Sequence, residues 1–190
     1  MEENHIKFPL FYLGLIIFAL SIMAAFVKIN NWYFPAVIGA LLLFDSVSGK
    51  KNSTISIFCN NKFRFLKLYL LLFSAGISIE SIGRLILHLW AYPHISSIFH
   101  EFMLFLFYPF ILMSFREMFE SILMYTQKKA MSFIASMILG IIIWEIPNLF
   151  AKDWIYLLPI DISFFNLNVI VILGWSMLIG IPLFIYKEYI

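Results

Sequence analysis

The sequence predicts an all-α protein: a polytopic integral membrane helical bundle of about six transmembrane helices, folded as a single transmembrane domain over residues 1–190. The first observation is composition, since 63% of the residues are hydrophobic, 13% are charged and the mean hydropathy is +0.94. Soluble domains carry about a quarter charged residues. The second observation is the recurrence of long apolar segments, and the third is the placement of Lys and Arg between them. The lipid bilayer is therefore the expected surroundings of the chain.

Six apolar segments reach or approach the roughly 20 residues that cross the hydrocarbon core of a bilayer. They lie at about 9–27, 32–48, 65–89, 97–115, 130–150 and 164–186. The second is the shortest, with Pro35 near its start, where proline is tolerated, and Asp45 near its end, where it is expected to reach headgroups or cap a turn. The start MEENHIKF is a poor signal-peptide n-region. We therefore expect the first segment to be a retained helix.

The distribution of Lys and Arg predicts the orientation, because positive residues are retained on the cytoplasmic side. Ten of them fall at the two ends and in the second and fourth loops, whereas the other loops hold two. This asymmetry requires an even number of helices and places both termini in the cytoplasm. Abundant Phe, Ile, Lys and Asn are typical of an AT-rich prokaryotic genome, which favours the cell membrane. The ten are Lys7, Lys50, Lys51, Lys62, Arg64, Lys67, Arg116, Lys128, Lys129 and Lys187, and the two are Lys28 and Lys152.

Several classes of function have no support in the sequence. A net charge of +2 with short juxtamembrane basic clusters does not indicate a nucleic-acid partner. The single cysteine, Cys59, excludes an intrachain disulfide and a CxxC site. No motif indicates a cofactor. His88, His94 and His100 near Glu101 could suit a metal, but their spacing of six is no known ligand pattern, so no metal is predicted.

Three helices that are predicted to run outward end in a similar way, at 31–35, 89–93 and 153–159, each with Trp, Tyr and a proline. One interpretation is an aromatic belt at the outer headgroups. The other is an internal repeat of parallel helical hairpins, because segments 77–93 and 142–159 both place a glutamate about ten residues before Trp-x-Tyr. Both interpretations stay open.

Ionisable residues inside a membrane span are costly, and each is a candidate functional residue unless it pairs or reaches the interface. Gly76, Glu80, Arg84 and His88 follow one another at spacings of four and lie on one helix stripe. Glu80 precedes Arg84 by one turn, the favourable order for an ion pair. The alternative is that the two charges neutralise each other and the pair has only a structural role in helix packing.

Glu145 lies at a similar predicted depth and is followed by Pro147 and Asn148, so a proline frees backbone carbonyls beside a carboxylate and an amide. We expect Glu80, Arg84, Glu145 and Asn148 to form a polar cluster for proton transfer. Two close carboxylates beside one arginine could hold one proton. On the other side of the same helix, a close-packing face is formed by Ser132, Ser136 and Gly140, and the deep Trp175 needs a partner for its N–H, either Asn168 or a freed carbonyl.

The segments IIIWEIPNLFAKDWIYLLP and ILGWSMLIGIP resemble a group of uncharacterised prokaryotic membrane proteins that have a W-E-x2-N helix and a W-x-Y exit. The earlier stretches NWYFPAVIGALLLFDSVSGKKNS and ESIGRLILHLWAYP are similar to the other half of that pattern. A fainter similarity, in size and in glutamates beside aromatic residues, is to membrane-embedded lycopene cyclases and carotenoid hydratases. That similarity implies an isoprenoid ligand, although the paired Pro-Glu-Glu segment of the cyclases is absent.

Three functions fit these features. The first is a membrane-embedded enzyme or binding protein for a lipophilic small molecule such as an isoprenoid, with Glu80 or Glu145 as proton donor and Arg84 as its electrostatic partner. The second is a small proton-coupled transporter that loads protons on the same acids. The third is a structural or assembly subunit whose buried charges specify packing.

Overall fold

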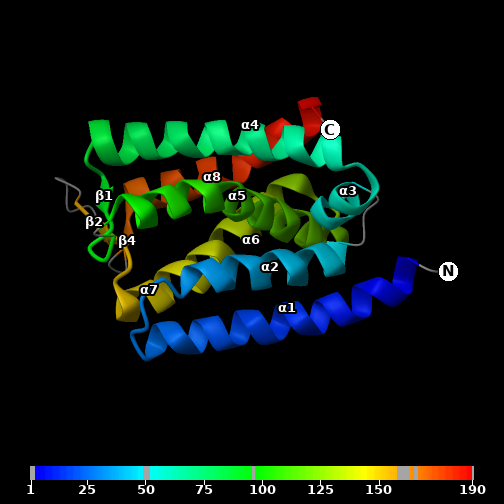
Figure 1. Cartoon of the computed structure of the whole chain (residues 1–190), viewed down its shortest axis with the longest axis horizontal. Coiled ribbons are helices and arrows are strands. Elements are labelled where there is room, and N and C mark those ends of the chain that lie inside the picture. The colour runs from blue at the N-terminus through cyan, green and yellow to red at the C-terminus, as the bar shows by residue number, and fades with distance from the viewer. Residues whose placement is uncertain (1–2, 49–51, 96, 158–162, 165–166, 190) are drawn as a thin grey trace.

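The structure is a computed structural model that describes residues 3–48, 52–95, 97–157, 163–164 and 167–189. It is almost entirely helical, with short strands at one end of the bundle (Figure 1). In chain order the elements are α1 (Glu3–Phe26), α2 (Tyr33–Ser48), α3 (Thr54–Asn60), α4 (Lys62–Glu80), the π-helical segment η1 (Ser81–Ile86), β1 (Trp90–Ala91), α5 (Ile98–Thr126), α6 (Lys129–Gly140), the π-helical segment η2 (Ile141–Glu145), α7 (Ile146–Ala151), β2 (Ile155–Tyr156), β3 (Ser163–Phe164), β4 (Leu167–Asn168) and α8 (Val169–Tyr189).

The predicted all-α membrane bundle is confirmed. Within the described residues, five helical segments are long and apolar enough to cross a membrane: Pro9–Phe26, Lys62–Ile86, Ile98–Thr126, Lys129–Ala151 and Val171–Tyr189. The sixth apolar helix, α2, has 16 residues, which is about 24 Å and shorter than the hydrocarbon core. It runs along α1 (Figure 1).

Helices α1 and α2 approach closely because each presents a glycine to the other. A Cβ atom on Gly14 would lie 2.6 Å from the backbone nitrogen of Leu43, and one on Gly39 would lie 2.6 Å from that of Phe18. Small residues permit this backbone contact, which is a common source of helix association in lipid. The pair forms one side of the bundle, next to α5 and α7.

Helix α5 is the centre of the fold and packs against α2, α4, α6 and α8. Its middle is buried on several sides, with Leu112 and Met113 fully covered. A helix that is apolar all round is expected in this position. The sequence placed the end of this helix at residue 115, but α5 continues to Thr126. Arg116 is therefore a buried helical residue and not a loop residue, which corrects its assignment to the fourth loop.

The structure differs from the sequence prediction in three further places. The short helix α3 was not predicted, because its seven residues carry no long apolar pattern. The third predicted helix ends at Ile86, and His88 has a φ of 51°, so His88 is exposed and leaves the stripe of Gly76, Glu80 and Arg84. Helix α8 begins at Val169, five residues after the predicted start at 164, and β3 and β4 precede it.

The end of the bundle where α4 and α7 finish carries a two-residue antiparallel ladder between β1 and β2 (Figure 1). Trp90 pairs with Tyr156 and Ala91 with Ile155. Both helices that lead to these strands contain a π-helical segment, η1 after Glu80 and η2 ending at Glu145. Short π-helical stretches are frequent at functional sites. The ladder therefore joins the two chain segments that carry the candidate glutamates.

Candidate functional site

Glu145 lies at the end of η2 and is 5% exposed. Its Oε1 atom accepts hydrogen bonds from the Tyr156 hydroxyl at 2.6 Å and from Trp175 Nε1 at 3.0 Å. Its Oε2 atom accepts one from Trp154 Nε1 at 3.3 Å. The N–H partner of Trp175 is thus a carboxylate of η2 and not a freed carbonyl. The side chain of Asn168, the other partner that the sequence suggested, lies outside the described residues. Three donors hold this buried acid in place.

Glu80 is arranged in the same way and is fully buried. It accepts a hydrogen bond from the Tyr92 hydroxyl at 2.8 Å and one from Trp90 Nε1 at 3.3 Å. The predicted ion pair is present, with Arg84 Nε 3.5 Å from Glu80 Oε2. Arg84 also pairs with Glu101 and lies over the Tyr92 ring. Each glutamate is therefore bound by the Trp and the Tyr of the exit that follows it.

Burial raises the pKa of the Tyr92 and Tyr156 hydroxyls well above their ordinary value, and the nearby glutamates raise it further. Both phenols consequently stay protonated near neutral pH and act as donors to the carboxylates. The correspondence between 77–93 and 142–159 thus extends from sequence to contacts. In both halves a π-helical segment, a buried glutamate and a Trp-x-Tyr strand occur together.

The prediction of an outer aromatic belt is wrong for the first exit, because Trp32 is 1% exposed. Its indole stacks on Trp144 at 5.8 Å and on Trp154 at 6.1 Å between ring centroids. Trp90 and Trp154 turn inward to the glutamates. These three indoles therefore face other side chains of the bundle.

A cavity of about 590 Å³ lies between the two glutamates and is lined by both of them. Its wall is mainly apolar and aromatic, with residues of η1, α5, η2 and α8 and the strands β1 and β2. Tyr33 also lines this cavity, and its buried hydroxyl has no hydrogen-bond partner within the described part of the chain. Ligand pockets for drug-sized molecules have volumes of about 300–1,000 Å³. The two acids that were predicted to meet therefore face one space.

Glycines make room for the rings that line this cavity. A Cβ atom on Gly83 would lie 1.8 Å from Trp90 Cη2, and one on Gly140 would lie 2.8 Å from Trp175 Cζ3. Gly140 belongs to the close-packing face with Ser132 and Ser136, all of which are buried as predicted. In contrast, a Cβ on Gly174, which also lines the cavity, would meet nothing within 4 Å. The cavity thus extends to the backbone of α8.

Asn148 does not line the cavity but fixes the strand that does. Its side-chain amide donates to the Trp154 carbonyl at 2.8 Å and accepts from the Trp154 N–H at 3.2 Å. This two-sided bond positions the indole and, two residues later, the Tyr156 hydroxyl against Glu145. Asn148 is therefore placed as a positioning residue, whereas Glu80 and Glu145 face the cavity and Arg84 lies beside Glu80.

We expect Arg84→Ala to lower the yield and thermal stability of the purified protein more than Lys152→Ala does. The first change leaves Glu80 buried without its cation, and breaking a buried pair costs about 3–5 kcal/mol. Lys152 is exposed and ends α7. Melting temperatures of the two variants in the same detergent provide the measurement. Equal losses of melting temperature in the two variants would show that the Arg84–Glu80 pair stabilises the protein no more than the exposed Lys152 does.

Asp153 links the third exit, at 153–159, to the residues before α2. Its Oδ2 atom accepts the Asn31 backbone N–H at 2.8 Å, while its buried Oδ1 atom has no partner among the described residues. Burial raises the pKa of Asp153 from its ordinary 3.8 to about 6, and the Asn31 bond and His94 lower it only in part. A protonated carboxyl needs no compensating charge, which suits this buried position.

The raised pKa of Asp153 predicts a pH dependence of stability. As pH rises from about 4 to about 6, the unfolded chain ionises at Asp153 before the folded chain does, so the free energy of unfolding should fall, with no further loss above that range. Asp153→Asn should remove this component. Melting temperatures of both proteins measured between about pH 4 and pH 7 test it, and identical profiles would contradict the assignment.

The described part of the chain contains no group of three or more His, Cys, Asp or Glu side chains that could hold a metal ion. His88, His94 and His100 are exposed at the strand end of the bundle. Arg84 Nη2, and not a histidine, is paired with Glu101.

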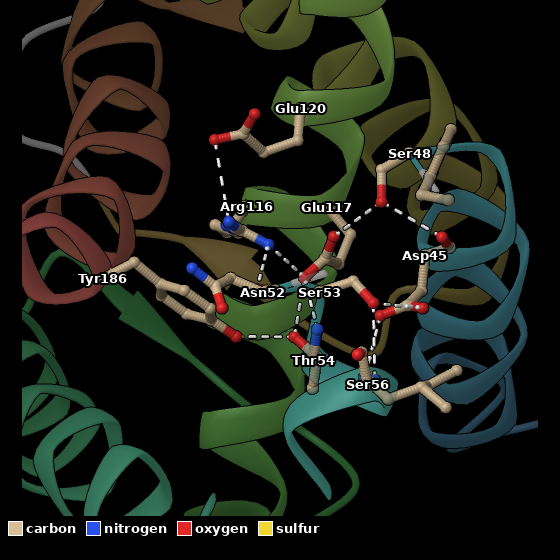
Figure 2. Close-up of polar contacts among 12 residues, drawn as sticks. Asp45, Ser48, Asn52, Ser53, Thr54, Ser56, Arg116, Glu117, Glu120 and Tyr186 are labelled. Atoms are coloured by element: carbon tan, nitrogen blue, oxygen red, sulfur yellow. Dashed lines mark hydrogen bonds and ion pairs between the residues drawn. The ribbon is translucent and has the colours of Figure 1, made fainter. Parts of the chain in front are cut away.

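A second polar cluster, which the sequence did not predict, lies at the opposite end of the bundle, near α3 (Figures 1 and 2). Glu117 is fully buried and accepts from Arg116 Nη1 at 2.6 Å, from the Thr54 N–H at 2.9 Å and from Ser48 Oγ at 3.1 Å. Tyr186 lies beneath the Arg116 guanidinium at 4.2 Å. We call this set the Arg116 cluster: Asp45, Ser48, Ser53, Thr54, Arg116, Glu117 and Tyr186.

Within the Arg116 cluster, Asp45 binds the start of α3. Its Oδ1 atom accepts from Ser53 Oγ at 3.0 Å and its Oδ2 atom from the Ile55 N–H at 2.9 Å. Of the two roles that the sequence left open for Asp45, capping a turn is confirmed. The cluster fastens α2, α3, α5 and α8 together and has a structural role.

Comparison of the chain with protein-family models, with curated proteins and with solved structures finds no match. The functional interpretation therefore depends on the geometry of this chain alone.

Proposed function

We propose that this multi-pass membrane protein binds a lipophilic small molecule in the cavity between Glu80 and Glu145. The observation that carries the proposal is a cavity of about 590 Å³ that is walled by apolar and aromatic side chains and holds two buried carboxyl groups. Ligand sites are typically apolar spaces with a few fixed polar groups.

The position of the opening supports entry from the lipid. Of the residues that line the cavity, Ile82 of η1, Leu87 directly after it, and Leu173 and Met177 of α8 are each more than half exposed. Helices α4 and α8 are neighbours (Figure 1). The opening therefore lies between these helices on a surface that is apolar and suited to the bilayer. An isoprenoid is one class of molecule that could enter in this way.

Binding is favoured over acid catalysis by the donors around the glutamates. Proton donation needs a protonated carboxyl, but the indole N–H of Trp90, Trp154 and Trp175 can only donate. These contacts stabilise the charged form of Glu80 and Glu145. A proton-coupled transporter would use the same acids, and it differs in requiring movement of the ligand across the membrane. A purely structural role gives no reason for the cavity.

Occupancy of the cavity can be tested with a pair of α8 variants. Gly174→Leu fills the cavity, and Gly180→Leu is the matched control, because a Cβ at either position meets nothing within 4 Å and Gly180 does not line the cavity. The proteins are purified from membranes and extracted with solvent, and the extracts are compared by mass spectrometry. We expect a lipophilic species that is enriched with wild type and Gly180→Leu and lost with Gly174→Leu. Identical extracts from all three would contradict the proposal.

We also propose that the chain lies in the cell membrane with both termini in the cytoplasm, as the Lys and Arg distribution predicts. Cys59 lies in α3 between α2 and α4 and is exposed. An impermeant maleimide added to intact cells should leave Cys59 unlabelled, whereas the same reagent should label it after permeabilisation. Labelling of Cys59 in intact cells would mean that the protein has the opposite orientation to the one proposed. Because the thiol is exposed, protection cannot arise from burial in the protein.

A further inference from the structure

We propose that the ligand of this cavity is a lipophilic cation that is held by Glu145. The inference rests on the proposed function and specifies the ligand class. It follows from three features of the site: the hydrogen bonds to Glu145, the absence of a paired cation among the described residues, and the aromatic wall.

The hydrogen bonds around Glu145 are those of an ionised carboxylate. Trp154 Nε1 and Trp175 Nε1 donate to its two oxygens, and an indole nitrogen cannot accept a proton in return. The Tyr156 hydroxyl is 2.6 Å from Oε1, beside the Trp175 bond at the same oxygen. A protonated Glu145 could direct its own hydrogen only at the Tyr156 oxygen, because the two indole nitrogens cannot accept. The ionised form is the one that accepts all three hydrogen bonds.

The segments that carry Glu80 and Glu145 differ in how the charge of the glutamate is balanced. Glu80 has Arg84 at 3.5 Å, four residues later in the chain. The corresponding position after Glu145 is Leu149, which is exposed. Within the described residues no Lys, Arg or His forms an ion pair with Glu145, although it is 5% exposed. A buried carboxylate without a partner is costly, so a cation in the adjacent cavity would be bound favourably.

The wall of the cavity fits a cation that has apolar substituents. Trp144, Trp154 and Trp175 line it together with Tyr33 and Tyr156. The faces of aromatic rings attract cations, and cages of such rings recognise quaternary ammonium groups. A neutral hydrocarbon would gain from the apolar surface but would leave the charge of Glu145 unbalanced. A lipophilic anion would be repelled by Glu145.

The experiment compares three probes that share four phenyl groups and differ in charge: tetraphenylphosphonium, neutral tetraphenylsilane and tetraphenylborate. Binding to the purified full chain in nanodiscs is followed by quenching of tryptophan emission. Gly174→Leu, which fills the cavity, provides the blank for partition into lipid. We expect the phosphonium to bind at least about tenfold more tightly than the silane, with no specific binding of the borate.

Glu145→Gln should remove that preference, while Glu80→Gln should change it less because Arg84 already balances Glu80. The comparison of the three probes on the wild-type protein tests the inference even if a variant fails to fold. Equal binding of silane and phosphonium, both lost in Gly174→Leu, would overturn the cation inference and leave the proposed function in place. Tighter binding of the borate would also overturn it. If no probe distinguishes wild type from Gly174→Leu, both proposals are wrong.

Discussion

Replacement of Arg116 by methionine is expected to lower the free energy of unfolding by about 3–5 kcal/mol. The reason is that Glu117 is fully buried and loses the only cation that pairs with it among the described residues, since Arg116 Nη1 lies 2.6 Å from Glu117 Oε1. The Thr54 and Ser48 donors remain. They are neutral and cannot balance the charge of a buried carboxylate, and methionine replaces only the apolar stem of arginine.

The loss at Arg116 can be separated from lost packing by a second change. Arg116→Met/Glu117→Gln removes both charges and keeps an acceptor for Thr54, so it should recover most of the stability. Unfolding in mixed detergent micelles measures the variants, and Lys129→Met is the control for removal of an exposed cation. If the double variant is as unstable as the sum of the two single variants, the two residues do not form a coupled pair.

The sequence predicted the helical bundle because the bilayer imposes a simple rule. Apolar segments of about 20 residues must be helical in lipid, and the charge count between them constrains the direction of the chain. Because a charged side chain within a span is unfavourable in contact with lipid, Glu80, Arg84 and Glu145 were expected to face the protein interior. These predictions depend on local composition, which a single sequence contains.

The partners of those side chains depend on contacts between distant segments, which one sequence does not contain. Trp175 lies on α8, 30 residues after Glu145, and its indole N–H donates to that carboxylate. The aromatic residues of the exits were equally compatible with the headgroup region. Only the fold shows that Trp32 and Trp154 turn into the bundle and stack.

The Arg116 cluster was missed for a related reason. The apolar pattern of α5 is interrupted by Arg116 and Glu117, so the helix was ended there and both residues were assigned to a loop. In the fold they lie inside the bundle because the short helix α3 supplies Thr54 as a polar partner. The seven residues of α3 lie between α2 and α4 and have no span-length apolar pattern, so neither the helix nor its partners could be predicted.

Gly83→Ala is expected to destabilise the protein by about 1–3 kcal/mol, whereas Gly180→Ala should stabilise it by up to about 1 kcal/mol. Alanine is the better helix former at both positions, so the intrinsic effect has the same sign. The surroundings differ: a Cβ on Gly180 meets nothing within 4 Å, but one on Gly83 would lie 1.8 Å from Trp90 Cη2. The indole must then move.

Displacement of the Trp90 indole by Gly83→Ala should also affect the cavity, because Trp90 donates to Glu80 and pairs with Tyr156 in the β1–β2 ladder. The test is a double-mutant cycle with Trp90→Leu, measured as the free energy of unfolding in detergent. Once the indole is absent, Gly83→Ala should cost nothing further, which gives a coupling energy of at least about 1 kcal/mol. Additive effects would show that Gly83 is not required to accommodate Trp90. In that case the requirement for a glycine at position 83 would come from the backbone of the π-helical segment η1 and not from contact with the Trp90 indole.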